Sequence, residues 1–158
     1  MEKKVEKVLF VGLGGIGQRH LRNLIQIKGN CVQVYAFRKR KAQFVLNSKL
    51  EIIENEELNA KYGIICVNSL EDAFQKGVDT VFICNPTSMH MEVLEKAIKA
   101  GCNVFIEKPI APNLEGVKEI ERLLSENRNT VFVGYQNRFH PCIVKAKELI
   151  DRQEIGNI

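Results

Sequence analysis

The sequence has 158 residues, of which 45% are hydrophobic and 27% are charged, proportions typical of one soluble globular domain. It contains no apolar run near the roughly 18 residues that cross a bilayer, and its first residues lack the apolar core of a secretory signal. Its five cysteines form no Cys-x-x-Cys pair, so we expect reduced thiols, no metal site and a cytoplasmic protein with no membrane partner.

The net charge of +4 is unevenly distributed along the chain. Residues 1–41 hold ten Lys or Arg and two acids, a balance of +8, whereas residues 42–158 have a balance of −4. The basic segment has no interleaved aromatic residues and no nucleic-acid-binding motif, so we expect no nucleic-acid partner. A positive field suited to a phosphorylated small molecule is the preferred interpretation, and a solvated basic face is the alternative.

A glycine-rich turn follows the first predicted strand, Val8–Val11. Its sequence is Gly12-Leu13-Gly14-Gly15-Ile16-Gly17, which fits the pattern G-x-G-x-x-G. The first glycine allows a tight turn, the second lets the backbone approach a pyrophosphate, and the third lets the following helix pack against the strand. The N–H groups opening that helix would face the anion. Strand, glycines and helix together predict dinucleotide binding, with a structural glycine turn as the alternative.

A basic run stands where many NAD-binding domains have an acidic residue. The first helix is predicted to end near Gly29, and Val32–Phe37 is the second predicted strand. An Asp or Glu after this strand would hold the ribose 2′-hydroxyl of NAD. This chain instead has Arg38-Lys39-Arg40-Lys41. A guanidinium can bind a 2′-phosphate with two hydrogen bonds, so Arg38 favours NADP(H) over NAD(H). An ordinary basic helix start is the alternative.

The segment after the basic run is open to two interpretations. Residues 42–62 form either a small hairpin, with Asn47-Ser48 as its turn, or a helix followed by a short strand. The acidic stretch Glu54–Tyr62 is predicted to be helical and to end at Gly63. Ile64–Val67 is then the third predicted strand of the core.

The second half of the chain alternates short helices with apolar strands. Ser69 is predicted to cap one helix, and Thr87 or Ser88 the next. Three further strands are predicted at Thr80–Cys84, Asn103–Ile106 and Thr130–Val133, with helices over about 113–126 and from Pro141 to about Arg152. Such alternation indicates an α/β fold with a doubly wound parallel sheet, in the strand order 3-2-1-4-5-6.

Polar residues follow the carboxyl ends of most of these strands. They are the glycine turn, Arg38, the segment Pro86–His90, Lys108 and the segment Tyr135–His140. Ligands of doubly wound sheets bind at that edge, so these residues are expected to converge on one site.

Four motifs make the chain resemble a known family. They are VGLGGIGQRH, NPTSMH, AGCNVFIEKPIA and GYQNRFHP, in the family's order. The chain resembles the N-terminal, dinucleotide-binding Rossmann domain of the glucose–fructose oxidoreductase / inositol dehydrogenase (Gfo/Idh/MocA) family. The resemblance implies a dinucleotide-binding domain over residues 1–150, with residues 151–158 starting the connection to an absent α+β substrate domain.

The resemblance also implies residue roles. It places the cofactor against Gly12, Leu13, Gly14, Gly15, Ile16, Gly17, Asn85, Pro86, His90 and Glu107. Lys108 would be catalytic, ordering the substrate and assisting proton movement, and Asn137 and Arg138 would edge the substrate pocket. Pro109 would follow a cis peptide bond. From the residues alone, Lys108 could merely pair with Glu107, and His20, His90 and His140 could be structural hydrogen-bonding groups.

The expected function is NAD(P)-dependent oxidation or reduction. The resemblance implies hydride transfer between nicotinamide and a carbon of a sugar, sugar derivative or cyclitol, with the full-length form a homo-oligomer. The cofactor would carry the redox chemistry while the protein supplies position and electrostatics. A non-catalytic nucleotide-binding or regulatory module is the alternative.

Overall fold

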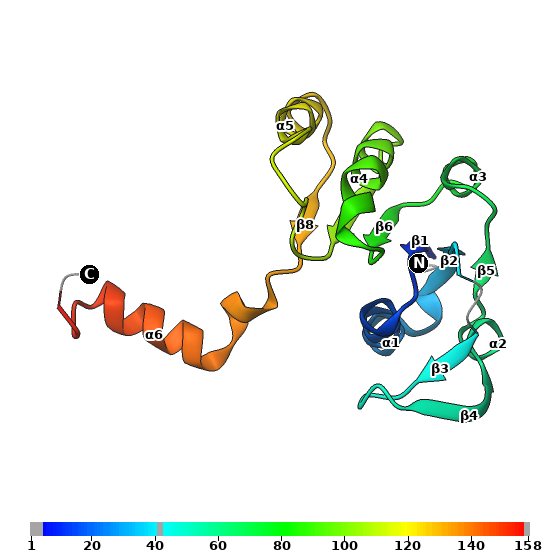
Figure 1. The fold of residues 1–158 in the computed structure, drawn as a ribbon, viewed down its shortest axis with the longest axis horizontal. Coiled ribbons are helices and arrows are strands. Elements are labelled where there is room, and N and C mark those ends of the chain that lie inside the picture. The colour runs from blue at the N-terminus through cyan, green and yellow to red at the C-terminus, as the bar shows by residue number, and fades with distance from the viewer. Residues whose placement is uncertain (1–4, 41–42, 157–158) are drawn as a thin grey trace.

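The computed structural model describes residues 5–40 and 43–156, which contain a six-stranded parallel sheet covered by helices on both faces (Figure 1). The strand order is β5-β2-β1-β6-β7-β8, which confirms the 3-2-1-4-5-6 order predicted for the core strands. The strands of this sheet are β1 (Glu6–Val11), β2 (Val32–Phe37), β5 (Ile65–Cys66), β6 (Thr80–Ile83), β7 (Asn103–Ile106) and β8 (Val131–Val133).

Helices on the two faces bury two separate hydrophobic clusters. The helices are α1 (Gly15–Lys28), α2 (Leu58–Tyr62), α3 (Leu70–Gln75), α4 (His90–Lys99), α5 (Val117–Glu126) and α6 (Pro141–Asp151), with short 3-10 turns η1 (Gly29–Cys31), η2 (Thr87–Met89) and η3 (Gln136–Phe139). Strand β1 alternates between the faces. Val8 and Phe10 pack with Leu21 of α1, whereas Leu9 and Val11 join the cluster beneath α3, α4 and α5.

The ambiguous segment after β2 is a hairpin. Strands β3 (Phe44–Leu46) and β4 (Ile52–Glu57) pair antiparallel as a separate two-stranded sheet. The prediction of a helix over Glu54–Tyr62 is therefore wrong for its first half, because β4 continues to Glu57 and α2 begins only at Leu58. Gly63 ends α2, as predicted, and adopts the left-handed conformation.

Other predicted boundaries need correction. The third core strand is only Ile65–Cys66, an edge strand with both residues exposed. Ser69 caps α3 as predicted, accepting the Asp72 N–H at 3.0 Å. Neither Thr87 nor Ser88 caps α4, because those residues form η2.

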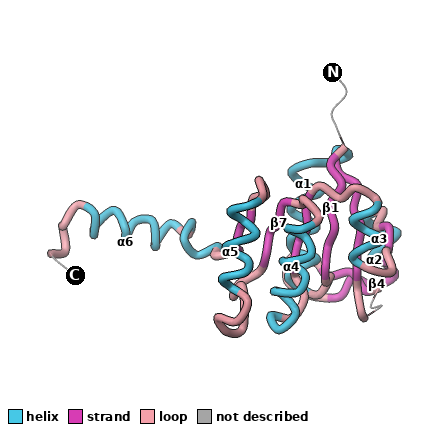
Figure 2. The backbone as a smooth tube through the Cα atoms, turned by 90° about the horizontal axis from the view of Figure 1, so that it is seen from above, coloured by secondary structure: helices cyan, strands magenta, loops and turns pink. Residues whose placement is uncertain are grey.

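The last two helices differ in how they are packed. Helix α5 begins at Val117, four residues later than predicted, after Gly116 in a left-handed conformation. Helix α6 extends beyond the sheet, and none of its residues is buried (Figure 2). Within the described residues, no helix is long and apolar enough to cross a membrane.

Candidate functional site

The glycine turn between β1 and α1 is shaped by close backbone contacts. Gly12 has a φ of +92°, and a Cβ there would lie 2.8 Å from the carbonyl oxygen of Cys84. A Cβ at Gly17 would lie 2.4 Å from the carbonyl oxygen of Gly12. These two glycines therefore allow the turn to form and the helix to pack against the strand.

Gly14 stands in open space. Apart from its chain neighbours, no atom of the described residues lies within 4 Å of the position that a Cβ would take there. Gly14 is the residue before α1, no side chain of the described residues caps this helix, and no acidic residue occupies its first turn. The first-turn N–H groups are thus exposed to the opening above Gly14, which suits a bound anion.

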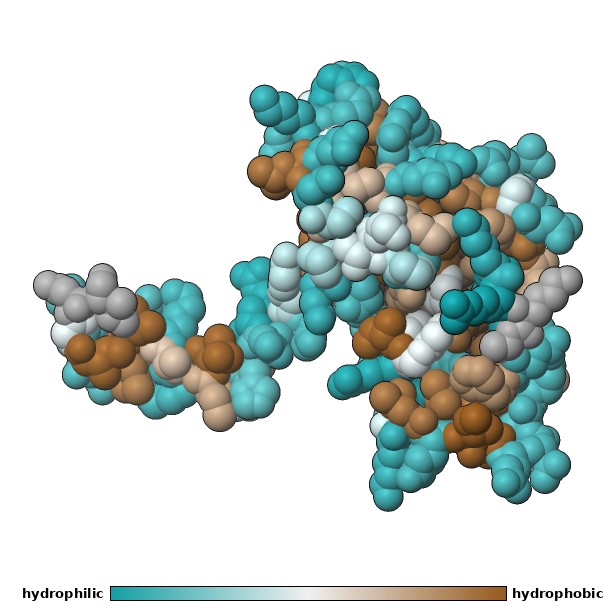
Figure 3. Space-filling view, in the orientation of Figure 1, coloured by the Kyte–Doolittle hydropathy of each residue, from teal (hydrophilic) through white to brown (hydrophobic). Residues whose placement is uncertain are grey.

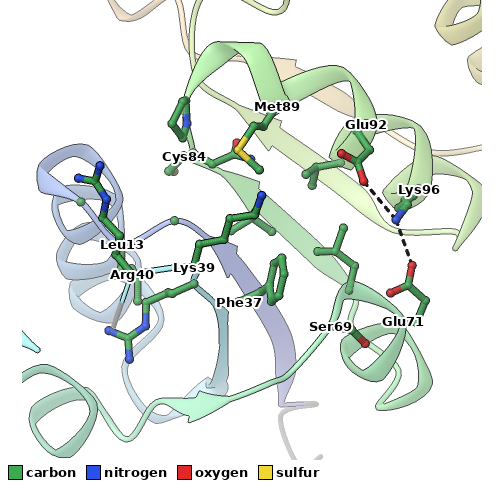
Figure 4. A pocket seen from close by; sticks show the side chains of 18 of the residues that line it. Leu13, Phe37, Lys39, Arg40, Ser69, Glu71, Cys84, Met89, Glu92 and Lys96 are labelled. Carbon is green, nitrogen blue, oxygen red and sulfur yellow. Dashed lines mark hydrogen bonds and ion pairs between the residues drawn. The ribbon is translucent and has the colours of Figure 1, made fainter. Parts of the chain in front are cut away.

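A cleft of about 770 Å³ lies over the carboxyl ends of β1, β2 and β6 (Figure 4). It brings together the residues of four segments that are distant in sequence. Among its lining residues are Gly12, Leu13 and Gly14, the turn Arg38 to Arg40, Ser69 to Glu71, and Cys84, Asn85, Pro86 and Met89. A cleft of this volume is within the range of small-molecule and cofactor sites.

The two ends of the cleft carry different charge. Lys39 and Arg40 are exposed on the side formed by the turn after β2. On the other side, Lys96 lies 3.2 Å from Glu71 and 3.3 Å from Glu92, so its charge is compensated (Figure 4). Hydrogen bonds to Glu71 first and to Glu92 second raise the pKa of Lys96. The positive end of the cleft is therefore the basic turn.

Arg38 is half-buried and lines the cleft, as the sequence predicts. Its Nη2 donates to Asn59 Oδ1 at 2.7 Å and to Cys66 Sγ at 3.4 Å. Asn59 is a residue that sequence reasoning missed, since it lies 21 positions away on α2. Lys41, the last residue of the basic run, lies outside the described residues.

The turn after β6 contains a buried amide without a partner. Both side-chain atoms Oδ1 and Nδ2 of Asn85 are buried and have no hydrogen-bond partner in the described part of the chain. Native proteins rarely leave such groups unpaired, so this amide is a candidate ligand contact. Neighbouring His90 is buried, with Nε2 2.9 Å from the Asn85 carbonyl oxygen and Nδ1 3.0 Å from that of Pro109. His90 therefore joins this turn to the next one.

The turn after β7 differs from expectation at Lys108. The Lys108–Pro109 peptide bond is cis, as the resemblance implies. Lys108 is exposed and lies outside the cleft lining, although it was expected to converge with the other polar residues on one site. Glu107 pairs with His20 on α1 instead, at 2.6 Å. Glu107 and Lys108 thus occupy the strand end next to Asn85, since β6 and β7 are neighbours.

The structure does not bring the predicted substrate residues into the cleft. Asn137 and Arg138 are exposed on η3, after β8 at the edge of the sheet. The Arg138 guanidinium lies over the Phe139 ring at 5.6 Å. His140 caps α6, its Nδ1 accepting the Cys142 N–H at 3.3 Å. Their distance from the cleft follows from the strand order, because two strands separate β8 from β1.

Gln18 is a further residue that sequence reasoning missed. It is 1% exposed, donates to the carbonyl oxygens of Leu13 and Phe44, and accepts the N–H of Leu46 at 2.8 Å. It thereby attaches the hairpin to the glycine turn. A polar residue inside the apolar stripe of α1, three positions before Leu21, was the available signal. Hydrophobic side chains of the hairpin remain exposed, among them Phe44, Leu50 and Ile52, and hydrophobic atoms are visible on the surface over the hairpin (Figure 3).

The cysteines differ in burial, so we expect them to differ in reactivity. Burial first, and the charge of Glu107 second, raise the pKa of Cys84 to about 12, and burial raises that of Cys102 to about 11. Cys66 and Cys142 are exposed. We expect iodoacetamide at about pH 8 to alkylate the two exposed thiols and to spare Cys84 and Cys102 until the chain is unfolded. Peptide mass spectrometry with a denatured control measures this, and rapid native labelling of Cys84 would contradict it.

A doubly wound parallel sheet with a glycine turn at the end of its central strand defines the class of dinucleotide-binding α/β domains. A family profile described as "Oxidoreductase family, NAD-binding Rossmann fold" matches residues 6–135. The chain therefore belongs to the Gfo/Idh/MocA oxidoreductase family.

Named relatives include inositol dehydrogenases. The chain is 31% identical over 156 residues to scyllo-inositol 2-dehydrogenase (NAD(+)) of Bacillus subtilis, covering 99% of this chain and 43% of that protein. It is 28% identical over 153 residues to myo-inositol 2-dehydrogenase of Thermotoga maritima, covering 95% of this chain and 42% of that protein. The crystal structure of apo scyllo-inositol dehydrogenase from Lactobacillus casei superposes with a TM-score of 0.78 at 28% identity, and the match covers 100% of this chain and 45% of that one. The chain thus spans less than half the length of these proteins.

Proposed function

We propose that this chain binds NAD(P)(H) in the cleft and forms the cofactor-binding part of an NAD(P)-dependent oxidoreductase. The open space above Gly14, at the uncapped start of α1, carries the proposal, because it offers backbone N–H groups to a pyrophosphate. The adenosine half would lie toward the basic turn and the nicotinamide half toward Asn85, whose unpartnered amide could contact it. The residues present therefore fit a dinucleotide.

The reaction is proposed to be hydride transfer to or from a carbon that bears a hydroxyl or carbonyl group. The bound nicotinamide supplies the redox chemistry. Lys108, exposed at the end of β7, would order the substrate and hold or release a proton at its oxygen. The inositol dehydrogenases among the relatives support a cyclitol, sugar or sugar derivative as the substrate class.

The substrate contacts are proposed to lie partly outside residues 1–150. The relatives are more than twice as long as the matched segment, which supports residues 151–158 as the start of a connection to a second domain. Asn137 and Arg138, exposed on η3, would then edge the substrate pocket from this chain's side. Residues 157 and 158 lie outside the described part of the chain.

Cofactor titration tests the binding proposal directly. We expect NADH or NADPH to bind the chain with enhanced fluorescence of the reduced nicotinamide, and calorimetry to give one site per chain. Absence of binding by both nucleotides would overturn the proposal. For the whole protein, a panel of cyclitols and sugars assayed for nicotinamide reduction tests the reaction, and no turnover with any of them would favour a binding module.

NADP(H) is the preferred cofactor in this proposal because Arg38 lines the cleft and its guanidinium is held by a hydrogen bond to Asn59. Arg38→Ala is expected to weaken NADP(H) binding by about 1–3 kcal/mol, the value of a charge-assisted contact, and to leave NAD(H) binding nearly unchanged. Calorimetric titration of both cofactors measures the difference.

Arg40→Ala is the matched control, with the same change of charge two residues along. An equal loss of NADP(H) affinity in the two variants would indicate a general positive field rather than a specific contact. Equal losses of NAD(H) and NADP(H) in Arg38→Ala would remove Arg38 from the specificity role.

A further inference from the structure

Helix α1 and the turn after β7 are joined by one short contact. His20 Nε2 lies 2.6 Å from Glu107 Oε1, and the two side chains are 20% and 13% exposed. The other carboxylate oxygen of Glu107 accepts the backbone N–H of Lys108 at 3.3 Å. Because a carboxylate only accepts, the imidazole N–H donates to it. One carboxylate therefore holds both the helix that follows the glycine turn and the peptide group of Lys108.

Aromatic packing fixes the position of His20. Its ring meets Phe105 edge-on, with centroids 4.7 Å apart, and Phe82 lies 6.1 Å away. Phe82 and Phe105 belong to a row of stacked rings that crosses β1, β6, β7 and β8 on the α1 face of the sheet. The imidazole is thus held against this row with its N–H directed at Glu107.

Gly134, directly after β8, leaves room for the His20–Glu107 pair. A Cβ at Gly134 would lie 3.1 Å from Phe105 Cζ and 3.4 Å from Glu107 Oε1, both tight contacts. A larger residue at this position would press on the ring and on the carboxylate. The absence of a side chain at Gly134 therefore leaves space for the Phe105 ring and the Glu107 carboxylate.

We propose that His20 is a positioning residue for the nicotinamide half of the cofactor. It acts through Glu107, which it keeps turned toward α1, so that the peptide of Lys108 keeps its hydrogen bond and its direction. The inference rests on the proposed function, in which the nicotinamide lies toward Asn85 at the end of β6, the strand next to β7. His20 is one helical turn beyond Gly17, so the helix that receives the pyrophosphate also sets the turn that meets the nicotinamide.

Comparison of two ligands separates positioning from general stability. NADH and ADP-ribose share the adenosine and pyrophosphate, but ADP-ribose lacks the nicotinamide. We expect His20→Leu in the full chain to weaken NADH binding by about fivefold and to leave ADP-ribose binding within about twofold of the wild type, because one hydrogen bond is lost at the nicotinamide end only. Isothermal titration calorimetry measures both affinities.

Two further variants complete the test. His20→Gln should restore NADH binding, because the glutamine amide can donate to Glu107 from a position close to that of Nε2. His20→Asn should behave like His20→Leu, because its amide is too short to reach Glu107. Asn23→Leu makes a comparable change on the exposed side of α1 and should alter neither affinity.

Each contrary outcome has its own meaning. Equal weakening of NADH and ADP-ribose by His20→Leu, or no weakening of either, would overturn the positioning role. Failure of both the Leu and Asn variants to fold, with Gln folding normally, would assign His20 to stability alone and also overturn it. Failure of the wild-type chain to bind either ligand would instead overturn the proposed function, and the inference with it.

Discussion

Gly14→Val is expected to weaken dinucleotide binding by about 100-fold while leaving the fold intact. Apart from its chain neighbours, no atom in the described part of the chain lies within 4 Å of a Cβ at Gly14, and its φ of −71° suits any residue, so the free protein can accept the side chain. The valine would, however, fill the opening above the first turn of α1. Each charge-assisted hydrogen bond lost there is worth about 1.5–3 kcal/mol, so we expect affinity to fall by about 100-fold.

Calorimetry with NADH and ADP-ribose measures this loss, and both ligands should lose affinity together because they share the pyrophosphate. The melting temperature should change by no more than about 2–4 °C, since only the residue before the helix is altered. Wild-type affinity in Gly14→Val would place the cofactor away from the glycine turn and overturn the proposed site.

Gly17→Ala, in contrast, is expected to lower the stability of the fold strongly. Its methyl group would lie 2.4 Å from the carbonyl oxygen of Gly12 and 3.4 Å from Cys84 Cβ. Neither neighbour is the end of a flexible side chain, so α1 must move away from β1. Overpacking of this kind costs about 3 kcal/mol, which corresponds to a fall of about 10 °C in melting temperature for a domain of this size.

Thermal unfolding followed by circular dichroism measures the fall. Asn23→Ala, on the exposed side of the same helix, is the matched control and should change stability by no more than about 0.5 kcal/mol. A melting temperature equal to that of the wild type would show that the close approach of helix and strand is not needed.

Sequence reasoning predicted the topology because the signals for it are local and repeated. Apolar runs such as Val8–Val11 identify buried strands, and right-handed crossovers leave few ways to order them. It was wrong over Glu54–Glu57, where the acidic composition indicated a helix but pairing with β3 keeps the chain extended. It also missed the late start of α5, which Gly116 sets by its left-handed conformation.

Only those residues of the candidate site that follow the end of a strand could be predicted from the sequence. Gly12, Leu13 and Gly14, together with Arg38 and Asn85, line the cleft because they follow the ends of strands. The partners of these residues could not be predicted in the same way. The contact between His20 and Glu107 spans 87 positions and depends on how α1 crosses the sheet. No local pattern encodes such a pairing.

Because Gln18 attaches the hairpin to α1, the hairpin cannot be removed from the domain without also changing this helix. Replacing residues 44–57 with a short connection would remove the Phe44 and Leu46 backbone partners of the buried Gln18 amide. A buried donor or acceptor left unsatisfied costs about 1–3 kcal/mol. A minimised domain would therefore need an apolar residue at position 18 as well, so loop and helix must be redesigned together.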